Sequence, residues 1–347
     1  MNNFKKIGVT ALAASLVSVS AQAVELNVNG YWELTHVSKD FSDAENASNN
    51  QGNAFGSKSA IEFSGSGDVN GMTASVYTAY NDAVNGMLSH QISLDMGDMG
   101  EVGLDQSVGA YGFSTIDDKS PTAYEESWHG TSFTSAGLGA TGGNDSTLGY
   151  KNAYAGFNLS VEYSPDFANT DQNGDGGSSG ITGQGSNTNF AITSSSLMDG
   201  LDVGFGAGQN NDTRVTNSTS QEQSSIGGFA NYSYGPVTVG YTRTYTSGGI
   251  AGTAANSVDA YGIAFNVNEN LSISMNQHDN EFKKTSDSTA AVGSQGQIDV
   301  TQESKGLAMA YTMGAAALRI QQNEVDNVGG VTNTNEEMTE ISLFLSF

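Results

Sequence analysis

The sequence predicts an all-β protein that closes into an antiparallel barrel of sixteen strands. Apolar and polar residues alternate along short segments throughout the chain, which gives each extended segment one apolar and one polar face. Tight turns and long polar loops alternate between these segments. The composition agrees, because 44 Gly and only 3 Pro are combined with 14 Tyr and 15 Phe, a content that disfavours helical and disordered chains.

The first predicted strand shows the pattern, with Leu26, Val28, Trp32 and Leu34 at even positions and polar residues such as Glu33 between them. Fifteen further segments repeat the alternation. They lie at 61–63, 72–76, 92–96, 102–104, 148–150, 157–163, 190–192, 201–205, 226–234, 237–241, 261–267, 271–275, 307–311, 318–320 and 341–347. We therefore expect sixteen strands.

The connections indicate where the strands run. Those near 70, 98, 199, 235, 269 and 314 are short and contain Gly or Asn, as tight hairpins do. Those near 45, 175, 215, 250, 290 and 330 are expected to be long, and they are polar. Short turns on one rim, long loops on the other and an even strand number are typical of transmembrane β-barrels, in which closure leaves no unpaired edge in the lipid.

Residues 1–23 are predicted to be a secretory signal peptide. Lys5 and Lys6 precede an apolar stretch, and the small-residue pattern at 21–23 suggests cleavage before Val24. The remaining 324 residues, 24–347, would form the barrel, with a formal charge of 10 − 37 = −27. Such acidity argues against nucleic acid as a partner. The chain has no cysteine, so it must be stable without disulfides.

Residues 108–145 interrupt the alternation but do not resemble a solvated loop. This stretch carries aromatic and aliphatic side chains that usually require packing partners: Tyr111, Phe113, Ile116, Tyr124, Trp128, Phe133 and Leu138. Between them lie the carboxylates Asp117, Asp118, Glu125 and Glu126. We therefore expect the stretch to fold inward as a constriction loop whose acids influence what passes through the barrel.

Strand parity suggests which cations face the carboxylates. Lys58, Lys151 and Arg319 fall on polar faces and are candidates for a basic pore wall that would create a transverse field. Arg243 shares parity with apolar neighbours, so it would point outward, where an Arg in mid-bilayer costs roughly 2–4 kcal/mol. A position above the membrane, a bulge or a subunit interface would each explain it.

Motifs for other chemistry are weak. Asp171, Asn173 and Asp175 imitate the first half of a calcium-binding loop, but the expected Glu at its twelfth position is Thr182. A loop-bound Ca²⁺ is thus a weak prediction, and no other cofactor is expected. The four histidines, at positions 36, 90, 129 and 278, are scattered without metal-ligand spacing. We expect no enzymatic activity.

The chain resembles the general porins of Gram-negative bacteria, in particular the alphaproteobacterial type. The resemblance covers the whole chain and is carried by residues 24–34, 94–100, 117–130, 261–267 and 341–347. The aromatic-terminated end is similar to the last strand by which assembly machinery recognises such barrels. The resemblance implies a homotrimer in the outer membrane, with the third extracellular loop folded into the lumen.

These observations lead us to expect an outer-membrane porin with a water-filled channel. Small hydrophilic solutes and ions would diffuse through it passively, with a mild preference for cations. A solute-specific channel on the same barrel is an alternative that saturable current would reveal. A surface β-structural protein or adhesin is another, and it should show fixed sequence repeats, of which we find none.

Overall fold

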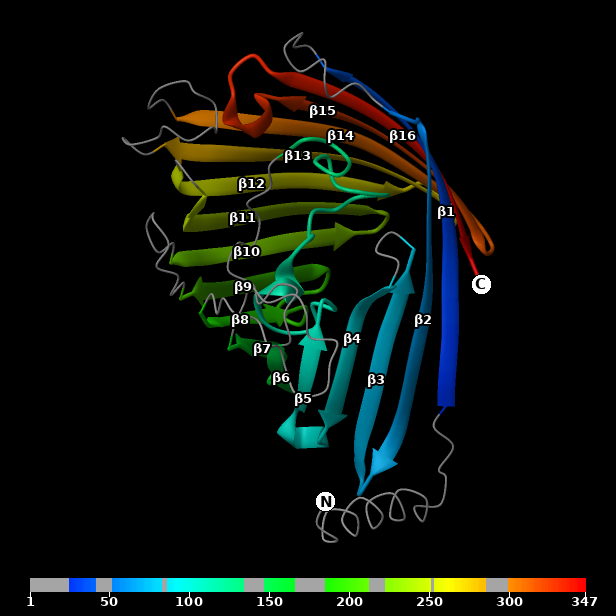
Figure 1. The fold of residues 1–347 in the computed structure, drawn as a ribbon, viewed down its shortest axis with the longest axis vertical. Coiled ribbons are helices and arrows are strands. Elements are labelled where there is room, and N and C mark those ends of the chain that lie inside the picture. Colours follow the sequence, from blue (N-terminus) through cyan, green and yellow to red (C-terminus); the bar gives the residue numbers. More distant parts are fainter. Residues whose placement is uncertain are drawn as a thin grey trace, which may run out of the picture.

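The computed structural model describes residues 25–41, 52–82, 86–133, 147–165, 185–211, 222–250, 253–284 and 299–347. These residues contain sixteen antiparallel strands in one closed barrel, in which each strand pairs with its neighbours in sequence and β1 pairs with β16 (Figure 1). The predicted strand number and closure are confirmed. The predicted signal peptide, at 1–23, lies outside the described residues.

The strands follow the predicted segments and extend most of them. They are β1 (Glu25–Phe41), β2 (Phe55–Val69), β3 (Met72–Asn81), β4 (Gly86–Asp95), β5 (Glu101–Gln106), β6 (Thr147–Tyr154), β7 (Phe157–Ser164), β8 (Asn187–Ser194), β9 (Leu201–Asn210), β10 (Gln223–Tyr234), β11 (Val237–Ile250), β12 (Thr253–Asn266), β13 (Leu271–Lys284), β14 (Val300–Met313), β15 (Ala316–Asp326) and β16 (Asn335–Ser346). The described residues also contain three short 3-10 turns between strands, η2 (Gly97–Met99), η3 (Gly112–Ile116) and η4 (Val328–Gly330). In the described part of the chain no helix is long and apolar enough to cross a membrane, a finding that does not bear on strands.

The alternating sequence places apolar side chains on the outer face of the barrel. Leu26 and Trp32 are 64% and 57% exposed, whereas Ser342 and Gln321, on the opposite face, are buried. Successive residues of a strand point to opposite sides of the sheet, so a single alternation produces both faces. The barrel therefore has an apolar exterior and a polar interior, the reverse of a soluble protein.

The register explains the position of Arg243. Arg243 lies directly opposite Asp259, and its guanidinium nitrogen Nη1 is 3.2 Å from Asp259 Oδ1. Asp279 and Glu303 continue the same row on β13 and β14. The irregularity in the β11–β12 pairing falls between Ser247 and Ile250, so no bulge changes the direction of Arg243. Arg243 thus belongs to a charged row on the outer face, beside the apolar side chains that cover most of this face, which we call the apolar belt.

Most connections agree with the prediction. Asn70 and Gly71 adopt positive φ in the β2–β3 turn, as a two-residue hairpin requires. The long loop expected near 250 is wrong, because β11 continues to Ile250 and β12 begins at Thr253. The polar Gly, Ser and Thr residues near position 250 extend β11 and β12 as a strand pair. This is possible because a strand that continues past the apolar part of the outer face can carry polar side chains on both of its faces.

Backbone hydrogen bonds at the chain end complete the closure. The amide of Gly30 donates to the Phe347 carbonyl, and the amide of Phe347 donates to the Gly30 carbonyl, each at 2.9 Å. On the interior, the rings of Tyr31 and Phe344 stack with centroids 5.2 Å apart. The aromatic C-terminus therefore helps to join the last strand to the first.

Candidate functional site

The connection between β5 and β6 lies along the inner wall of the barrel. We call its described part, residues 108–133, the β5–β6 segment (Figure 1, teal to green). Its contacts follow the strand order: the amides of Gly112 and Phe113 donate to Ser160 of β7 and Asn189 of β8. Further along, the Lys119 carbonyl accepts from Asn231 of β10.

The same order continues through the second half of the segment. The Ala123 amide donates to Ser274 of β13, and the His129 carbonyl accepts from Asn323 of β15. The Ser132 amide donates to Glu336 of β16. A chain segment can reach the polar face of all these strands only from inside the closed barrel. The segment therefore follows the inner wall from β7 to β16.

Paired glycines on the wall make room for side chains of the segment. Gly103 of β5 lies opposite Gly149 of β6, and the ring of Tyr111 occupies the space where a Cβ of Gly149 would stand. Tyr111 is fully buried, and its hydroxyl donates to Glu101 at 2.7 Å. The predicted need of this aromatic residue for a packing partner is thus confirmed.

Two further glycine pairs repeat the arrangement. Phe113 lies over Gly206 of β9 and Gly227 of β10, which are opposite each other. Pro121 lies over Gly240 of β11 and Gly262 of β12, where an added Cβ would come within 2.5 and 2.7 Å of Pro121 Cδ. Such distances are too short for non-bonded carbon atoms, so larger residues here would displace the segment.

A buried polar junction holds the middle of the segment on β13 and β14. His278 Nε2 lies 3.1 Å from Glu126 Oε2, and His278 Nδ1 lies 2.8 Å from Ser127 Oγ. Ser127 Oγ is also 2.7 Å from Ser304 Oγ. These are the residue types of a hydrolytic triad, but Ser127 is 0% exposed and faces the wall. The arrangement fixes the segment and gives a substrate no access to the hydroxyl.

Glu126 differs from the expectation of an acid that faces the channel. Its carboxylate is buried and also accepts hydrogen bonds from Trp128 Nε1 at 2.6 Å and from the Ser120 amide at 3.1 Å. Burial by itself would raise the pKa of Glu126, but the hydrogen bonds from His278, Trp128 and Ser120 outweigh it and hold this pKa below its usual range. Glu126 thus remains ionised as an anchor.

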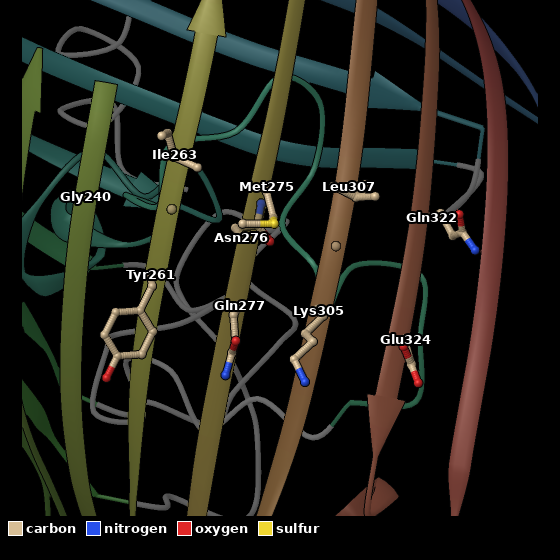
Figure 2. Close-up of a pocket in the computed structure, with 12 residues that line it drawn as sticks. Gly240, Tyr261, Ile263, Met275, Asn276, Gln277, Lys305, Leu307, Gln322 and Glu324 are labelled. Atoms are coloured by element: carbon tan, nitrogen blue, oxygen red, sulfur yellow. The ribbon is translucent and has the colours of Figure 1, made fainter. Parts of the chain in front are cut away.

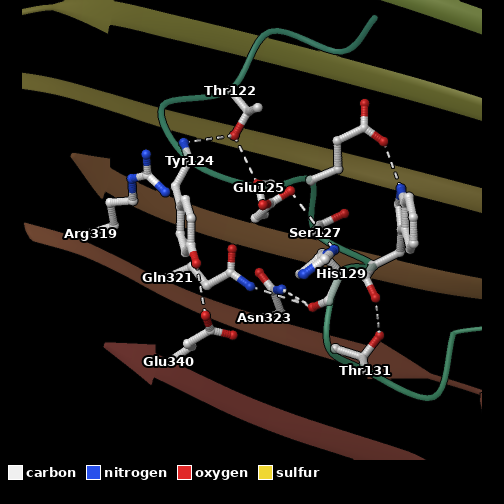
Figure 3. A network of polar contacts seen from close by, with 12 residues as sticks. Thr122, Tyr124, Glu125, Ser127, His129, Thr131, Arg319, Gln321, Asn323 and Glu340 are labelled. Carbon is white, nitrogen blue, oxygen red and sulfur yellow. Dashed lines mark hydrogen bonds and ion pairs between the residues drawn. The ribbon is translucent and has the colours of Figure 1, made fainter. Parts of the chain in front are cut away.

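Tyr124 connects the segment to the seam between β1 and β16 (Figure 3). Its hydroxyl lies 3.0 Å from Glu33 Oε1 and 2.8 Å from Glu340 Oε1. The Arg319 guanidinium lies over the Tyr124 ring at 5.2 Å and over the Phe344 ring at 4.2 Å. This cluster combines two carboxylates, one guanidinium and two aromatic rings at the inner wall of the barrel.

The remaining carboxylates of the segment are accessible. Asp117 and Asp118 are exposed, and the Glu125 side chain is 41% exposed. Their side chains are accessible, yet protein surrounds them on several sides. This partial loss of solvation, reinforced by the charge of Asp118, raises the pKa of Asp117 to about 6. Partial burial also raises the pKa of Asp118 and of Glu125, with Glu126 and Glu33 adding negative charge nearby.

Two of the predicted cations, Lys58 and Arg319, lie close to Glu33, and the third, Lys151, lies on β6. Lys58 of β2 is exposed and is opposite Glu33 of β1. Lys151 of β6 pairs with Glu101 at 3.1 Å, and both line a hollow of about 490 Å³ beside the segment. Arg319 of β15 lies 3.6 Å from Glu33. Each cation therefore has a carboxylate close to it, which partly compensates its charge.

Some polar side chains of the strands opposite the segment stay accessible from the interior. Lys58 is exposed, and Glu62, Tyr77 and Gln91 of β2, β3 and β4 are half-buried. The polar face beneath the segment is more deeply covered, as the 2% exposure of Asn189 and the 3% exposure of Asn276 illustrate. The accessible part of the interior thus lies between the segment and strands β1 to β4.

Sequence reasoning found the segment and its carboxylates but missed the wall that receives them. The glycine pairs occupy interior positions of otherwise regular strands. Glycines at polar-face positions of the predicted strands were the pattern that could have indicated where the segment packs. No local signal marked His278. The weak calcium candidates Asp171, Asn173 and Asp175 lie outside the described residues. Within the described ranges no three acidic or histidine side chains are placed to hold a metal ion.

No protein-family model matches the chain, and no curated protein matches it in sequence. Its fold is similar to solved structures. These include OmpF of Salmonella typhi in complex with daunomycin, at 13% identity over 95% of this chain and 99% of that one, with a TM-score of 0.67. The outer membrane channel DcaP of Acinetobacter baumannii has 11% identity over 94% and 99%, with a TM-score of 0.66. A variant of the Rh. blastica porin has 14% identity over 93% and 100%, with a TM-score of 0.55. At these identities the likeness shows the fold.

Proposed function

We propose that this protein is an outer-membrane channel of the porin kind, through which small hydrophilic solutes and ions diffuse passively with a preference for cations. The observation that carries this proposal is the position of the β5–β6 segment. Residues 112–132 follow the wall from β7 to β16, while Lys58, Glu62 and Gln91 of β2 and β4 stay accessible. A water-filled path would run between these two surfaces and be narrowed by the segment.

The cation preference rests on the charges along that path. Asp117, Asp118 and Glu125 are accessible on the segment, and Glu33 of β1 lies beside it, in contact with Tyr124. Lys58 and Arg319 lie close to Glu33, so their charge is partly compensated. Acidic side chains that line a pore favour cations over anions. Glu126 would contribute mainly by holding the segment in place.

The membrane location is supported by the outer face of the barrel. Strands that cross a bilayer must satisfy every backbone hydrogen bond, and the closed sheet does so without a free edge. The exposed side chains of the belt are apolar, with Leu148 at 58% and Met275 at 57%. Similar folds include the outer membrane channel DcaP. The proposal therefore places lipid around the belt.

Several parts of the proposal come from the sequence. We include a cleaved signal peptide before Val24 and a homotrimer, in keeping with the resemblance to general porins. The proposal also includes a calcium ion bound by Asp171, Asn173 and Asp175. N-terminal sequencing, mass measurement of the purified oligomer and calcium titration would test these three points separately.

Single-channel recording in a planar bilayer under a KCl gradient tests the function. We expect stepwise ohmic openings with a reversal potential on the cation-selective side. The variant D118N/E125Q should move this potential toward zero, whereas E281Q, on the outer face, should leave it unchanged. Current that saturates with one solute would instead indicate a solute-specific channel. A folded, inserted protein without conductance would overturn the proposal.

A further inference from the structure

The β5–β6 segment begins at a buried carboxylate of the inner wall. Asp105 is 3% exposed and lies one residue before the end of β5, on the same face as Gly103. Its Oδ1 accepts a hydrogen bond from the Val108 amide at 2.9 Å, and its Oδ2 accepts one from the Ala110 amide at 2.8 Å. One carboxylate thus binds two main-chain amides at the point where the chain leaves the wall.

The backbone turns sharply at this point. Ser107 and Gly109 adopt positive φ of 58° and 73°, a conformation that costs energy for a residue with a Cβ such as Ser107. The Ser107 carbonyl accepts a hydrogen bond from Ser89 Oγ of β4 at 2.9 Å. Because Asp105 binds amides within and directly after this bend, it stabilises the bend against relaxation. Asp105 therefore directs the chain from β5 into the interior.

A second buried carboxylate holds the other end of the described segment. Glu336 of β16 is 0% exposed, and its Oε2 accepts a hydrogen bond from the Ser132 amide at 2.7 Å. Its Oε1 lies 3.1 Å from Lys39 Nζ of β1. A buried carboxylate needs such a cation or hydrogen-bond donor to remain ionised. The exit of the segment is thus tied to β1 and β16, the two strands that close the barrel.

The contacts at the two ends differ from most of those between them. Hydrogen bonds to an ionised acceptor are roughly twice as strong as those between neutral groups. The contacts of residues 112–123 with the wall are made largely with neutral Ser and Asn side chains. The accessible acids Asp118 and Glu125 lie between Asp105 and the residue bound by Glu336. Detachment of either end would therefore move these acids relative to β1 to β4.

We propose that Asp105 and Glu336 are positioning residues of the channel, which hold the ends of the β5–β6 segment against the wall and set the width of the path without contacting the solute. The proposal rests on the function proposed above. Loss of either anchor would let that end of the segment move toward the open interior, because the wall blocks movement in the other direction. We expect brief partial closures when an anchor is removed, while the acids of the segment are all still present.

Single-channel recordings of Asp105→Asn and Glu336→Gln test the anchors. Each variant keeps the shape of the side chain and removes its charge. The fraction of open time spent at reduced conductance should rise about tenfold, as expected when a hydrogen bond to a charged acceptor is weakened. Two exposed carboxylates serve as controls, Glu337 on the outer face of β16 and Asp95 of β4. Glu337→Gln and Asp95→Asn remove the same charge and should leave this fraction unchanged.

A disulfide separates movement of the segment from loss of charge. Ser127 Oγ of the segment lies 2.7 Å from Ser304 Oγ of β14, and the chain has no cysteine of its own. Ser127→Cys combined with Ser304→Cys should therefore form a single disulfide. Ser304 faces the interior, whereas its neighbour Lys305 points to the outside of the barrel, as Gln277 does on β13 (Figure 2). The disulfide thus locks the segment to the inner wall, close to the exit anchor at Ser132.

The locked wild type gives the baseline. In locked Glu336→Gln channels the partial closures should return to this baseline, and a reducing agent should restore them in the same recording. If Glu336→Gln does not fold, Lys39→Gln weakens the same anchor and should show the same closures at lower frequency. Closures that persist under the lock, or anchor variants that behave like the wild type, would overturn the proposal. A folded, inserted wild type without conductance would count against the proposed function instead.

Discussion

His278 Nε2 lies 3.1 Å from Glu126 Oε2, and this contact joins the wall strand β13 to the β5–β6 segment. Both side chains are buried, with 4% and 8% of their residue surface exposed. The adjacent Ser127 completes the junction through His278 Nδ1. The segment is therefore attached at its midpoint by an ionised carboxylate and not merely by apolar packing.

Replacement of Glu126 by Gln should destabilise the protein by about 1–3 kcal/mol, since buried donors of His278, Trp128 and Ser120 lose a charged acceptor. The free energy of unfolding in urea measures the effect. Glu125→Gln is the matched control, because its side chain is 41% exposed, and it should leave stability nearly unchanged. Equal effects of the two variants would show that the buried junction contributes little.

Replacement of Gly262 by Ala should displace Pro121, whose Cδ would be 2.7 Å from the new Cβ. Overpacking of this kind typically costs about 1–3 kcal/mol. Because the segment can move only toward the open interior, we also expect a smaller single-channel conductance. Gly52→Ala serves as control, since nothing lies within 4 Å of a Cβ at that position. An unchanged conductance in Gly262→Ala would mean that the wall yields instead of the segment.

Cation preference should decrease as the pH is lowered from 7 to 5. The pKa of Asp117 is raised to about 6, and below this value the protonated, neutral carboxyl group predominates. Each protonated carboxylate removes a negative charge from the path. Reversal potentials recorded across this pH range measure the change, and Asp117→Asn should show a flatter dependence. A preference that stays constant over the range in the wild type would contradict the proposed role of Asp117.

Replacement of Arg319 by Gln should increase the cation preference. The guanidinium lies 3.6 Å from Glu33 and over the ring of Tyr124, so its loss leaves the negative charge at this point less compensated. The shift of the reversal potential under a KCl gradient gives the size of the effect. Lys283→Gln, which removes a cation from the outer rim, should cause no comparable shift. If Arg319→Gln and Lys283→Gln shift the reversal potential equally, the net charge of the protein determines its ion selectivity, and the position of the cation does not.

The polar seam at Tyr124 also shows how far sequence reasoning reached. The prediction placed Tyr124 in a segment that must pack against something, and its ring does contact Arg319, a predicted wall residue. The partners Glu33 and Glu340 were not predicted as such. They belong to the first and last strands, which meet only when the sheet closes, so no local pattern in the sequence connects them.

The sequence by itself determined the strands, their two faces, most of the turns and the segment that departs from the pattern. These features depend on alternation between neighbouring residues, which is local information. Only the tertiary structure decided which acids are accessible: Glu125 and Glu126 are adjacent, yet one is half exposed and the other is bonded to His278. His278 and Ser127 are 151 residues apart. Their contact depends on barrel closure and on the register of every intervening strand pair, and glycine pairs on the wall leave the space that makes it possible.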